Sequence, residues 1–205
     1  MKDKLIQGFE RFHNGYFQRN REYLAQLAKK QSPEIAIVSC CDSRVDPNIL
    51  FDLDPGDLFV IRNVANLVPP FETQGDYHGT SAALEFAVSC LRVKQVVVLG
   101  HAHCGGIRAL MENDGSMKPD GFIDSWMQLA QGAKEEVLAR TDLATAEMRM
   151  DACEKTAVKY SLKNLMTYPW VQREVAEGNL SLMGFYYDLR SGEMVALDEI
   201  DGATT

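Results

Sequence analysis

The sequence predicts an α/β fold with a mostly parallel sheet of about four strands and a C-terminal antiparallel edge strand, flanked by helices, with a helical arm at the N-terminus. Short runs of aliphatic and β-branched residues indicate buried strands of a parallel sheet. These runs are Ile35–Val38, Leu58–Ile61 and Val96–Leu99. Segments with apolar residues at helical spacing separate them, and this alternation is typical of α/β proteins.

The helical arm is predicted over residues 1–30. Large apolar residues recur at helical spacing from Leu5 to Phe17, and a second helical stretch surrounds Tyr23–Leu27. These side chains must be buried on the chain's own core or on another subunit. Pro33 follows the arm and cannot continue a helix. The α/β core is therefore expected over residues 34–200, and residues 1–205 are expected to form a single domain.

The remaining elements follow from turn signals and periodicity. A turn at Asp54–Asp57 precedes the second strand, and a helix is expected to begin at Gly79 or Thr80. Another helix follows Gly105-Gly106. After a polar loop at 113–116, a long helical region with interruptions runs from 122 to 167. The alternation of apolar residues from Leu180 to Tyr186 predicts a late strand, and a hairpin turn at 190–193 leads to an edge strand at 194–197.

Composition excludes several classes of function. Hydrophobic residues make up 46% and charged residues 24% of the 205 residues, which is ordinary for a globular protein. The net charge of −8 argues against nucleic acid or an anionic membrane as a partner. The N-terminal residues lead into an amphipathic pattern rather than the apolar core of a secretion signal. Five cysteines without a disulfide-framework spacing favour free or metal-bound thiols in a reducing cytoplasm.

Thiols and an imidazole follow two of the predicted strands. Cys40 comes directly after the first strand, and His101 and Cys104 come after the third. The carboxyl ends of parallel strands meet at one edge of the sheet, where open α/β proteins bind their ligands. Zinc prefers thiolate and imidazole ligands. With the carboxylate of Asp42 beside them, these residues outline a catalytic zinc site with one open position.

The pattern of residues alone leaves alternatives for the ligands. Cys40 and Cys41 are adjacent, and since successive strand residues point to opposite faces, only one of them should face the metal. His101 and His103 compete in the same way. The cysteines could also be ordinary buried thiols, which is a common state of this residue.

Two motifs resemble those of the β-class carbonic anhydrases: Cys40-x-Asp42-Ser43-Arg44 and His101-x-x-Cys104-Gly105-Gly106. The resemblance covers roughly residues 5–198 and includes the segments 62–66, 79–88 and 97–101. It implies one Zn²⁺ per subunit with Cys40, His101 and Cys104 as its ligands. Cys41 is then a core or helper residue. His103 is left as a group that supports the ligands, a proton relay or a structural residue, of which the structural role is favoured.

The resemblance implies an activity, the reversible hydration of CO2 to bicarbonate and a proton by hydroxide carried on zinc. In the family, the aspartate corresponding to Asp42 accepts a hydrogen bond from this hydroxide, and the arginine corresponding to Arg44 holds the aspartate. Two thiolates and a neutral imidazole cancel the charge of Zn²⁺, which makes the metal a weaker Lewis acid than one held by three histidines. Activity is therefore expected to rise toward alkaline pH.

The resemblance also implies the residues of a substrate pocket. CO2 carries no charge, so its pocket should be small and mostly apolar. Plant-like members line it with a glutamine from the adjacent subunit and with Phe, Val and Tyr. The matching residues here are Gln31, Phe59, Val64 and Phe86, where Phe86 replaces the tyrosine and removes its hydroxyl. The amide of Gly105 could support a substrate oxygen.

Two further expectations follow from the family. Members that bind bicarbonate at a second, inhibitory site carry Trp and Gly where this chain has Ile37 and Ser39. We therefore expect no such site, and an open zinc site at neutral pH rather than the closed state in which the aspartate binds zinc. Family members are built on a dimer embraced by N-terminal helices, so we expect a homodimer or a larger assembly such as a tetramer.

Two other functions fit part of the same pattern. A related zinc hydrolase acting on CS2 or COS would use identical ligands. A non-catalytic zinc-binding module would need no Asp42–Arg44 pair, and a structural zinc normally has four protein ligands. The intact pair therefore favours an enzyme.

Overall fold

The computed structural model describes residues 2–75, 77–113 and 121–202. The chain divides into two units, residues 1–32 and 33–205. The first unit contains α1 (Lys2–Phe12), the π-helical turn η1 (His13–Phe17) and α2 (Arg21–Leu27), which confirms the predicted helices of the arm. Neither α1 nor α2 buries a residue, and the Leu5 side chain is 78% exposed.

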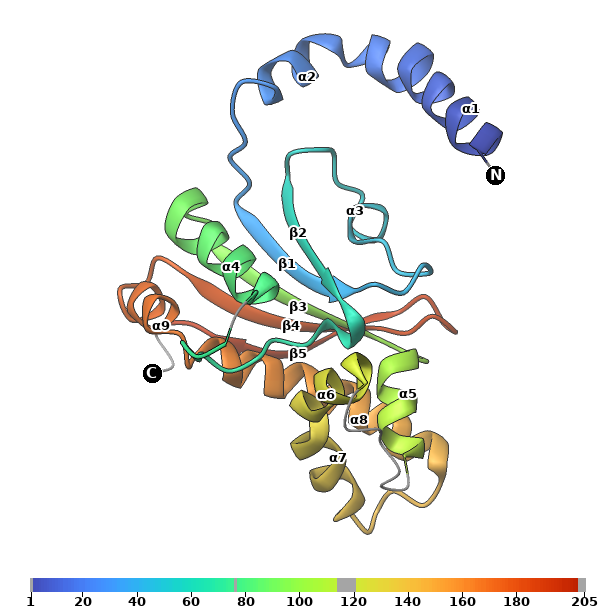
Figure 1. Ribbon diagram of the computed structural model, residues 1–205, viewed down its shortest axis with the longest axis vertical. Helices are drawn as coiled ribbons and strands as arrows, with labels where there is room; N and C mark the ends of the chain where they lie inside the picture. The colour runs from blue at the N-terminus through green and yellow to red at the C-terminus, as the bar shows by residue number, and fades with distance from the viewer. Residues whose placement is uncertain (1, 76, 114–120, 203–205) are drawn as a thin grey trace. The chain divides into compact units, whose positions relative to one another are not determined.

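The second unit is built on a five-stranded sheet in the order β2-β1-β3-β4-β5. Neighbours among the first four strands run parallel, and β5 pairs with β4 in the antiparallel direction, as predicted (Figure 1). The strands are β1 (Ile35–Cys40), β2 (Leu58–Asn63), β3 (Gln95–His101), β4 (Ser181–Tyr187) and β5 (Met194–Ile200). Because Cys40 pairs with Asn63 and Ser39 with Leu99, β1, β2 and β3 end at one carboxyl edge.

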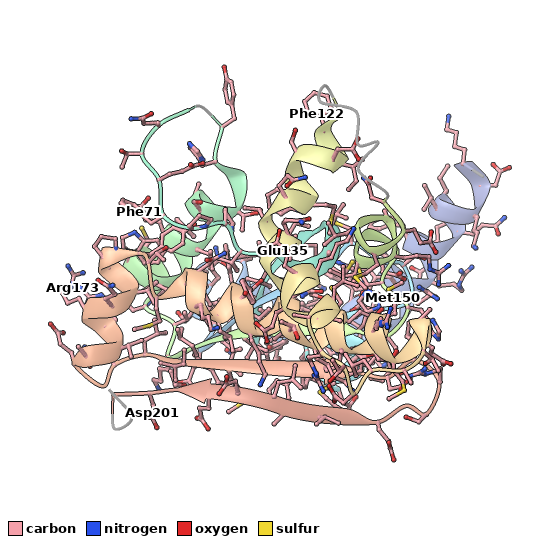
Figure 2. All side chains as sticks on the ribbon, turned by 90° about the horizontal axis from the view of Figure 1, so that it is seen from below. Phe71, Phe122, Glu135, Met150, Arg173 and Asp201 are labelled. Atoms are coloured by element: carbon pink, nitrogen blue, oxygen red, sulfur yellow. The ribbon has the colours of Figure 1, made fainter. Side chains whose placement is uncertain are left out.

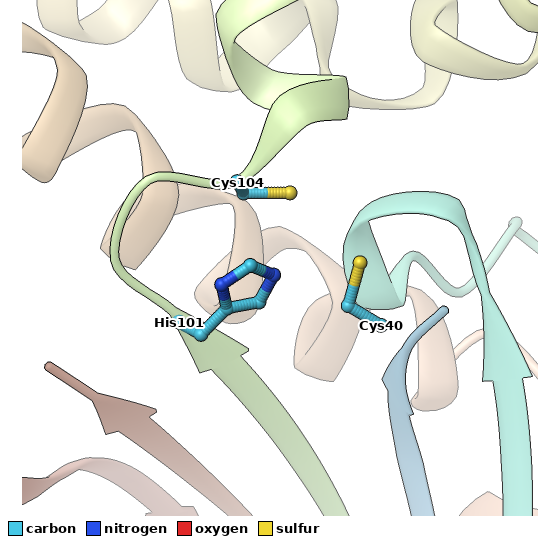
Figure 3. A group of neighbouring side chains, drawn as sticks. All are labelled: Cys40, His101 and Cys104. Carbon is cyan, nitrogen blue, oxygen red and sulfur yellow. The ribbon is translucent and has the colours of Figure 1, made fainter. Parts of the chain in front are cut away.

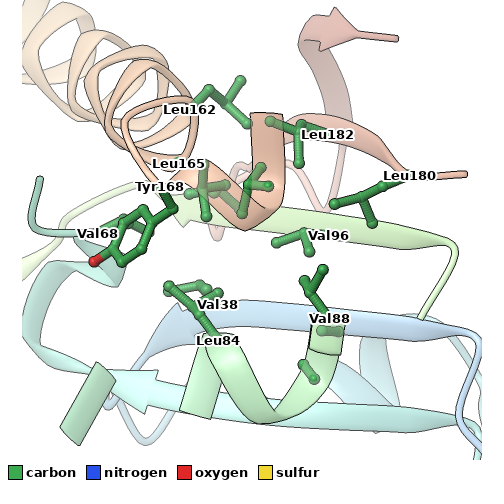
Figure 4. Packing of buried hydrophobic residues seen from close by; sticks show 14 of the residues in the cluster. Val38, Val68, Leu84, Val88, Val96, Leu162, Leu165, Tyr168, Leu180 and Leu182 are labelled. Carbon is green, nitrogen blue, oxygen red and sulfur yellow. The ribbon is translucent and has the colours of Figure 1, made fainter. Parts of the chain in front are cut away.

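The main core lies on one face of this sheet. Alternate strand residues such as Val38, Val96 and Leu182 point to it. They pack against α4 (Gly79–Glu85), the π-helical turn η3 (Phe86–Leu91), α8 (Ala146–Leu165) and α9 (Pro169–Ala176) (Figure 4). Figure 2 shows α8 and α9 on the same side of β4 and β5, with Arg173 marking α9 and Asp201 the end of β5.

The opposite face carries a smaller cluster formed by Ile37, Val45, Val97 and Leu99. The short helix α3 (Pro47–Leu50) follows β1. The Asp46 side chain caps it by accepting hydrogen bonds from the backbone N–H groups of Asn48 and Ile49, and Pro47 occupies its first turn. The sequence analysis did not predict α3 or the separate helix α9, although both begin with a proline.

A third cluster surrounds the carboxyl edge of β1 and β3. It is formed by α5 (Gly105–Glu112), α6 (Phe122–Met127), the 3-10 turn η4 (Gln128–Ala130) and α7 (Gln131–Leu138), together with α8. The helical region predicted at 122–167 is therefore confirmed as α6, η4, α7 and α8. Val64–Asn66 forms the 3-10 turn η2, which follows β2. The polar loop predicted at 113–116 lies outside the described residues except for Asn113. Across the described parts of the chain, no helix has the length and apolarity needed to cross a membrane.

Candidate metal centre

Three buried side chains converge at the carboxyl edge of the sheet. Cys40 is the last residue of β1, His101 is the last residue of β3, and Cys104 follows the turn that leads into α5. Their donor atoms lie within 4.8 Å of one another. Figure 3 shows the two sulfur atoms and the imidazole ring directed toward a common space. The structure thus brings together the three residues that the family resemblance implies, while Cys41 is exposed.

The imidazole of His101 is oriented with one nitrogen toward this space. Nδ1 hydrogen-bonds to the carbonyl oxygen of Ala102 at 2.8 Å, which assigns the ring proton to Nδ1. Nε2 is buried and has no hydrogen-bond partner among the described residues. A buried polar atom without a partner is costly, and a metal ligand position removes that cost.

The two thiols influence each other's ionisation. A hydrogen bond from Cys104 lowers the pKa of the Cys40 thiol, and this same contact, together with burial, raises the pKa of Cys104. Two thiolates cannot both carry a charge side by side in a buried site without a cation. The backbone N–H of Ala65 also donates to Cys40 Sγ at 3.4 Å, from a residue in the left-handed region with φ of 64°. The pair therefore favours a divalent cation.

Asp42 and Arg44 form a bidentate pair next to the ligands. Arg44 Nε donates to Asp42 Oδ1 at 2.9 Å and Nη2 donates to Oδ2 at 2.8 Å. These hydrogen bonds hold the pKa of Asp42 well below its usual range, so the carboxylate stays ionised. Arg44 Nη2 also donates to the carbonyl oxygen of His103 at 3.0 Å, which links the Cys40 segment to the Cys104 turn. The prediction that zinc keeps an open coordination position at neutral pH, with Asp42 not bound to it, stays a prediction.

Arg62 supports the backbone of the same segment. Its Nε donates to the carbonyl oxygen of Cys40 at 2.9 Å, and its Nη2 donates to the carbonyl oxygens of Asp42 and Val45 at 2.8 and 2.6 Å. The sequence analysis noted Arg62 only as part of a family segment. Its position directly after the predicted strand Leu58–Ile61 was the available signal for a role at this edge.

Glu154 is a second residue that the sequence analysis missed. It lies in the middle of α8, is 2% exposed and contacts the backbone of Cys104. Burial raises the pKa of its carboxyl group, and the hydrogen bond from Tyr186 opposes this effect. An acidic residue among the buried positions of a helix was its only sequence signal.

The predicted pocket residues fall into three groups. Val64 and Gly105 flank the triad, since Val64 precedes the Ala65 amide that contacts Cys40 and Gly105 follows Cys104. Gln31 belongs to the first unit. Phe59 and Phe86 form the third group, because the structure does not bring them to the triad of the same chain.

These two aromatic residues lie further back along the sheet. Their rings contact each other with centroids 5.9 Å apart, and the Phe86 side chain is 43% exposed. Phe59 pairs with Ala36, four residues before Cys40, which is a displacement of about 13 Å along the strand. Their role in a substrate pocket stays a prediction that needs a second copy of the chain.

A family model described as carbonic anhydrase matches residues 35–194. The chain belongs to the β-carbonic anhydrase family. It is 38% identical over 186 residues to Beta carbonic anhydrase 5, chloroplastic, of Arabidopsis thaliana, with 91% of this chain covered. The chain spans 61% of the length of that relative. The family named from the two sequence motifs is therefore confirmed.

Solved structures agree with this family and its fold. The structure of the β-carbonic anhydrase CcaA has a TM-score of 0.89 and 33% sequence identity, covering 98% of this chain and 91% of that chain. One of two tetrameric β-carbonic anhydrases from Sordaria macrospora has a TM-score of 0.82 and 29% identity, with 95% of each chain covered. The Cys-His-Cys triad is typical of the zinc site of β-carbonic anhydrases, and its donor set fits zinc.

Proposed function

We propose that this protein catalyses the reversible hydration of CO2 to bicarbonate and a proton, with one Zn²⁺ per subunit held by Cys40, His101 and Cys104. The observation that carries this proposal is the buried triad with the Asp42–Arg44 pair beside it, in a chain of the carbonic anhydrase family. When bound, zinc supplies a Lewis acid that makes water a nucleophile near neutral pH.

Asp42 orients the attacking oxygen. An ionised carboxylate can only accept hydrogen bonds, so Asp42 accepts the O–H of the nucleophile and leaves an oxygen lone pair directed at the substrate. The two hydrogen bonds from Arg44 fix both carboxylate oxygens and keep the group ionised. Arg62 holds the backbone carbonyl of Asp42 and thereby the position of the whole segment.

Val64 and Gly105 contribute to the substrate side of the centre. Val64 offers an apolar wall suited to uncharged CO2. Gly105 is the first residue of α5, and the backbone amides of a helix N-terminus are suited to stabilise negative charge on a substrate oxygen. A Cβ atom on Gly105 would meet nothing within 4 Å, which supports open space beside this amide.

We propose that the active form is a homodimer or a larger homo-oligomer such as a tetramer. The exposed apolar residues Leu5 and Phe9 of α1 support this, because large apolar groups require a partner surface. The Phe59–Phe86 pair also lies too far along the strand to serve its own triad, so a second copy would have to supply it. A related structure from Sordaria macrospora is described as tetrameric.

We also propose a reducing compartment, with the cytoplasm as our expectation. All five cysteines are free thiols, two of them in the metal centre. The Arabidopsis thaliana relative is described as chloroplastic. Fractionation of cells that express the chain, with antibody detection, tests the cytoplasmic assignment.

Zinc analysis combined with stopped-flow CO2 hydration tests the proposed reaction. We expect one zinc per chain and hydration well above the buffer rate, rising from pH 6 to pH 9. Zinc present without hydration would refute the proposal. Hydrolysis of COS or CS2 in place of CO2 hydration would assign the centre to the related hydrolase chemistry.

Analytical ultracentrifugation tests the assembly. We expect a dimer or a tetramer for the full chain and a shift toward smaller species when Leu5 and Phe9 are both replaced by serine. A monomeric full chain with undiminished hydration would contradict the proposed role of a second copy.

A further inference from the structure

A buried carboxylate supports the turn that carries Cys104. Glu154 Oε1 accepts a hydrogen bond from the backbone N–H of Cys104 at 2.9 Å, and Oε2 accepts one from the hydroxyl of Tyr186 at 2.8 Å. Within the described residues, no lysine or arginine forms an ion pair with this carboxylate. The two hydrogen bonds therefore hold Glu154 in place. Burying a carboxylate costs desolvation free energy, which indicates that this side chain has a specific role.

The turn that Glu154 contacts has an unusual backbone. His103, directly before Cys104, is in the left-handed region with φ of 56°, which is uncommon for a residue other than glycine. The hydrogen bond to the Cys104 N–H fixes the peptide plane between these two residues. That plane contains the Cα atom of Cys104, from which the thiol side chain extends, so the carboxylate constrains the starting point of this side chain.

The helix that carries Glu154 is well placed for this purpose. α8 has 20 residues and packs closely on the sheet, since a Cβ atom on Gly100 of β3 would lie 2.5 Å from Val158. Tyr186 belongs to β4, which pairs with β3. Glu154 and Tyr186 therefore both lie on regular elements of the core, and the hydrogen bond to the Cys104 N–H connects them to the turn.

The same helix also reaches the segment that contacts the other thiol. Ser161 lies seven residues after Glu154, on the same helical face. Its hydroxyl accepts the N–H of Val68 at 3.2 Å and donates to the carbonyl oxygen of Asn66 at 3.4 Å. Asn66 follows Ala65, whose amide donates to Cys40 Sγ. α8 thus supports both thiol-bearing sides of the centre.

We propose that Glu154 is a positioning residue of the metal centre, which with Tyr186 fixes the Cys104 turn so that its thiolate is preorganised for zinc. Outer groups that orient metal ligands typically change metal affinity by about 10- to 100-fold when removed. This role rests on the proposed function only where it assumes that the zinc centre serves catalysis. The main test therefore measures the release of zinc rather than the activity.

Four variants of the zinc-loaded full-length protein separate the possible roles. Glu154→Gln keeps an acceptor for the Cys104 N–H, because its amide oxygen can face Cys104 while its NH2 group donates to the Tyr186 oxygen. Glu154→Leu leaves the buried N–H without an acceptor. Tyr186→Phe removes the group that orients the carboxylate. Thr156→Val is the matched control, since Thr156 is buried in the same helix but lines a separate surface hollow with Lys159 and Leu197.

The measurement is the rate of zinc release to a chromogenic chelator, with the thiolate-to-metal absorption of the Co²⁺-substituted protein as a second readout. We expect release about tenfold or more faster for Glu154→Leu, a smaller increase for Tyr186→Phe, and rates within about threefold of wild type for Glu154→Gln and Thr156→Val. The Co²⁺ absorption should change for Glu154→Leu and stay unchanged for Thr156→Val.

Wild-type zinc release and an unchanged Co²⁺ spectrum in a folded Glu154→Leu protein would overturn the inference. If Glu154→Leu does not fold, Tyr186→Phe decides, and release at the wild-type rate with an unchanged Co²⁺ spectrum overturns it. A zinc-loaded wild type that fails to hydrate CO2 refutes the proposed function, whereas the release rates of the variants still decide the role of Glu154.

Discussion

The two segments that supply the thiols differ in the charged side chain that holds them. The Asp42 part of the Cys40 segment is held from the solvent side, by an Arg44 side chain that is 53% exposed. The Cys104 turn is held from the interior, by Glu154 and Tyr186. The difference indicates that the two segments have different roles. In the proposed reaction, the segment that presents Asp42 meets water and substrate, whereas Cys104 serves as a metal ligand.

Loss of a metal ligand should produce the largest effect of all these substitutions. Cys40→Ala removes one of three donor atoms, so we expect zinc content and CO2 hydration to fall to background. Cys41→Ala, which changes the adjacent exposed thiol, is the control and should keep both. Zinc content by atomic emission and hydration by stopped flow check the prediction. A Cys40→Ala protein with full zinc content would contradict the ligand assignment.

Asp42→Asn should affect the rate while the metal is retained. The variant keeps the shape of the side chain but replaces an acceptor-only carboxylate with an amide. We expect kcat for hydration to fall by about 100-fold at unchanged zinc content. This result would separate the roles of the two thiol-bearing segments, because Glu154→Leu, which affects the Cys104 turn, is expected to change zinc release instead. Rapid zinc loss from Asp42→Asn would contradict the assignment of the reaction rate to the Asp42 segment and of metal retention to the Cys104 turn.

A methyl group at two neighbouring glycines should distinguish the buried side of the Cys104 turn from its open side. On Gly106 a Cβ atom would lie 2.8 Å from Val64 and 3.1 Å from Ala65, whereas on Gly105 it would meet nothing within 4 Å. We expect Gly106→Ala to destabilise the protein by about 1–3 kcal/mol and Gly105→Ala to leave the Tm nearly unchanged. Thermal unfolding followed by circular dichroism measures both. Equal Tm values would show that the packing behind the turn is loose.

The smallest effect is expected at the surface of α8. Arg190 joins the β4–β5 hairpin to this helix through Glu147 and Asp151, and it also pairs with Asp188. Its hydrogen bonds lower the pKa of Asp188 from an ordinary value of 3.8 to about 2. Because the folded pKa is the lower one, the stabilisation is complete above the unfolded value and is lost as the pH falls through about 2.

Asp188→Asn should therefore lower the Tm slightly at pH 7, since exposed ion pairs contribute little. The difference between wild type and Asp188→Asn should begin to shrink below about pH 4 and should be nearly gone at pH 2. Thermal melts of both proteins across this range provide the measurement. A difference that grows on acidification would contradict the assignment of Asp188 as the ionised partner.

Much of the fold and of the metal centre could be predicted because the signals are local. The buried strands appear as apolar runs, and the ligand types appear within a few residues of two strand ends. The helices α3 and α9 were missed because each is short, with four and eight residues, and α9 follows directly on the long helical region. The prediction of pocket residues rested on the family alone, and the register of β1 and β2 placed Phe59 away from the triad of its own chain.

The sequence by itself indicated the α/β class through its apolar runs and the family through two short motifs, and the resemblance to that family implied the Cys-His-Cys donor set. Only the tertiary structure decided which groups support the ligands. Glu154 is 50 residues from Cys104, and Arg62 is 22 residues from Cys40. Contacts over such separations have no local pattern, since they exist only after the helix and the strands have packed against one another.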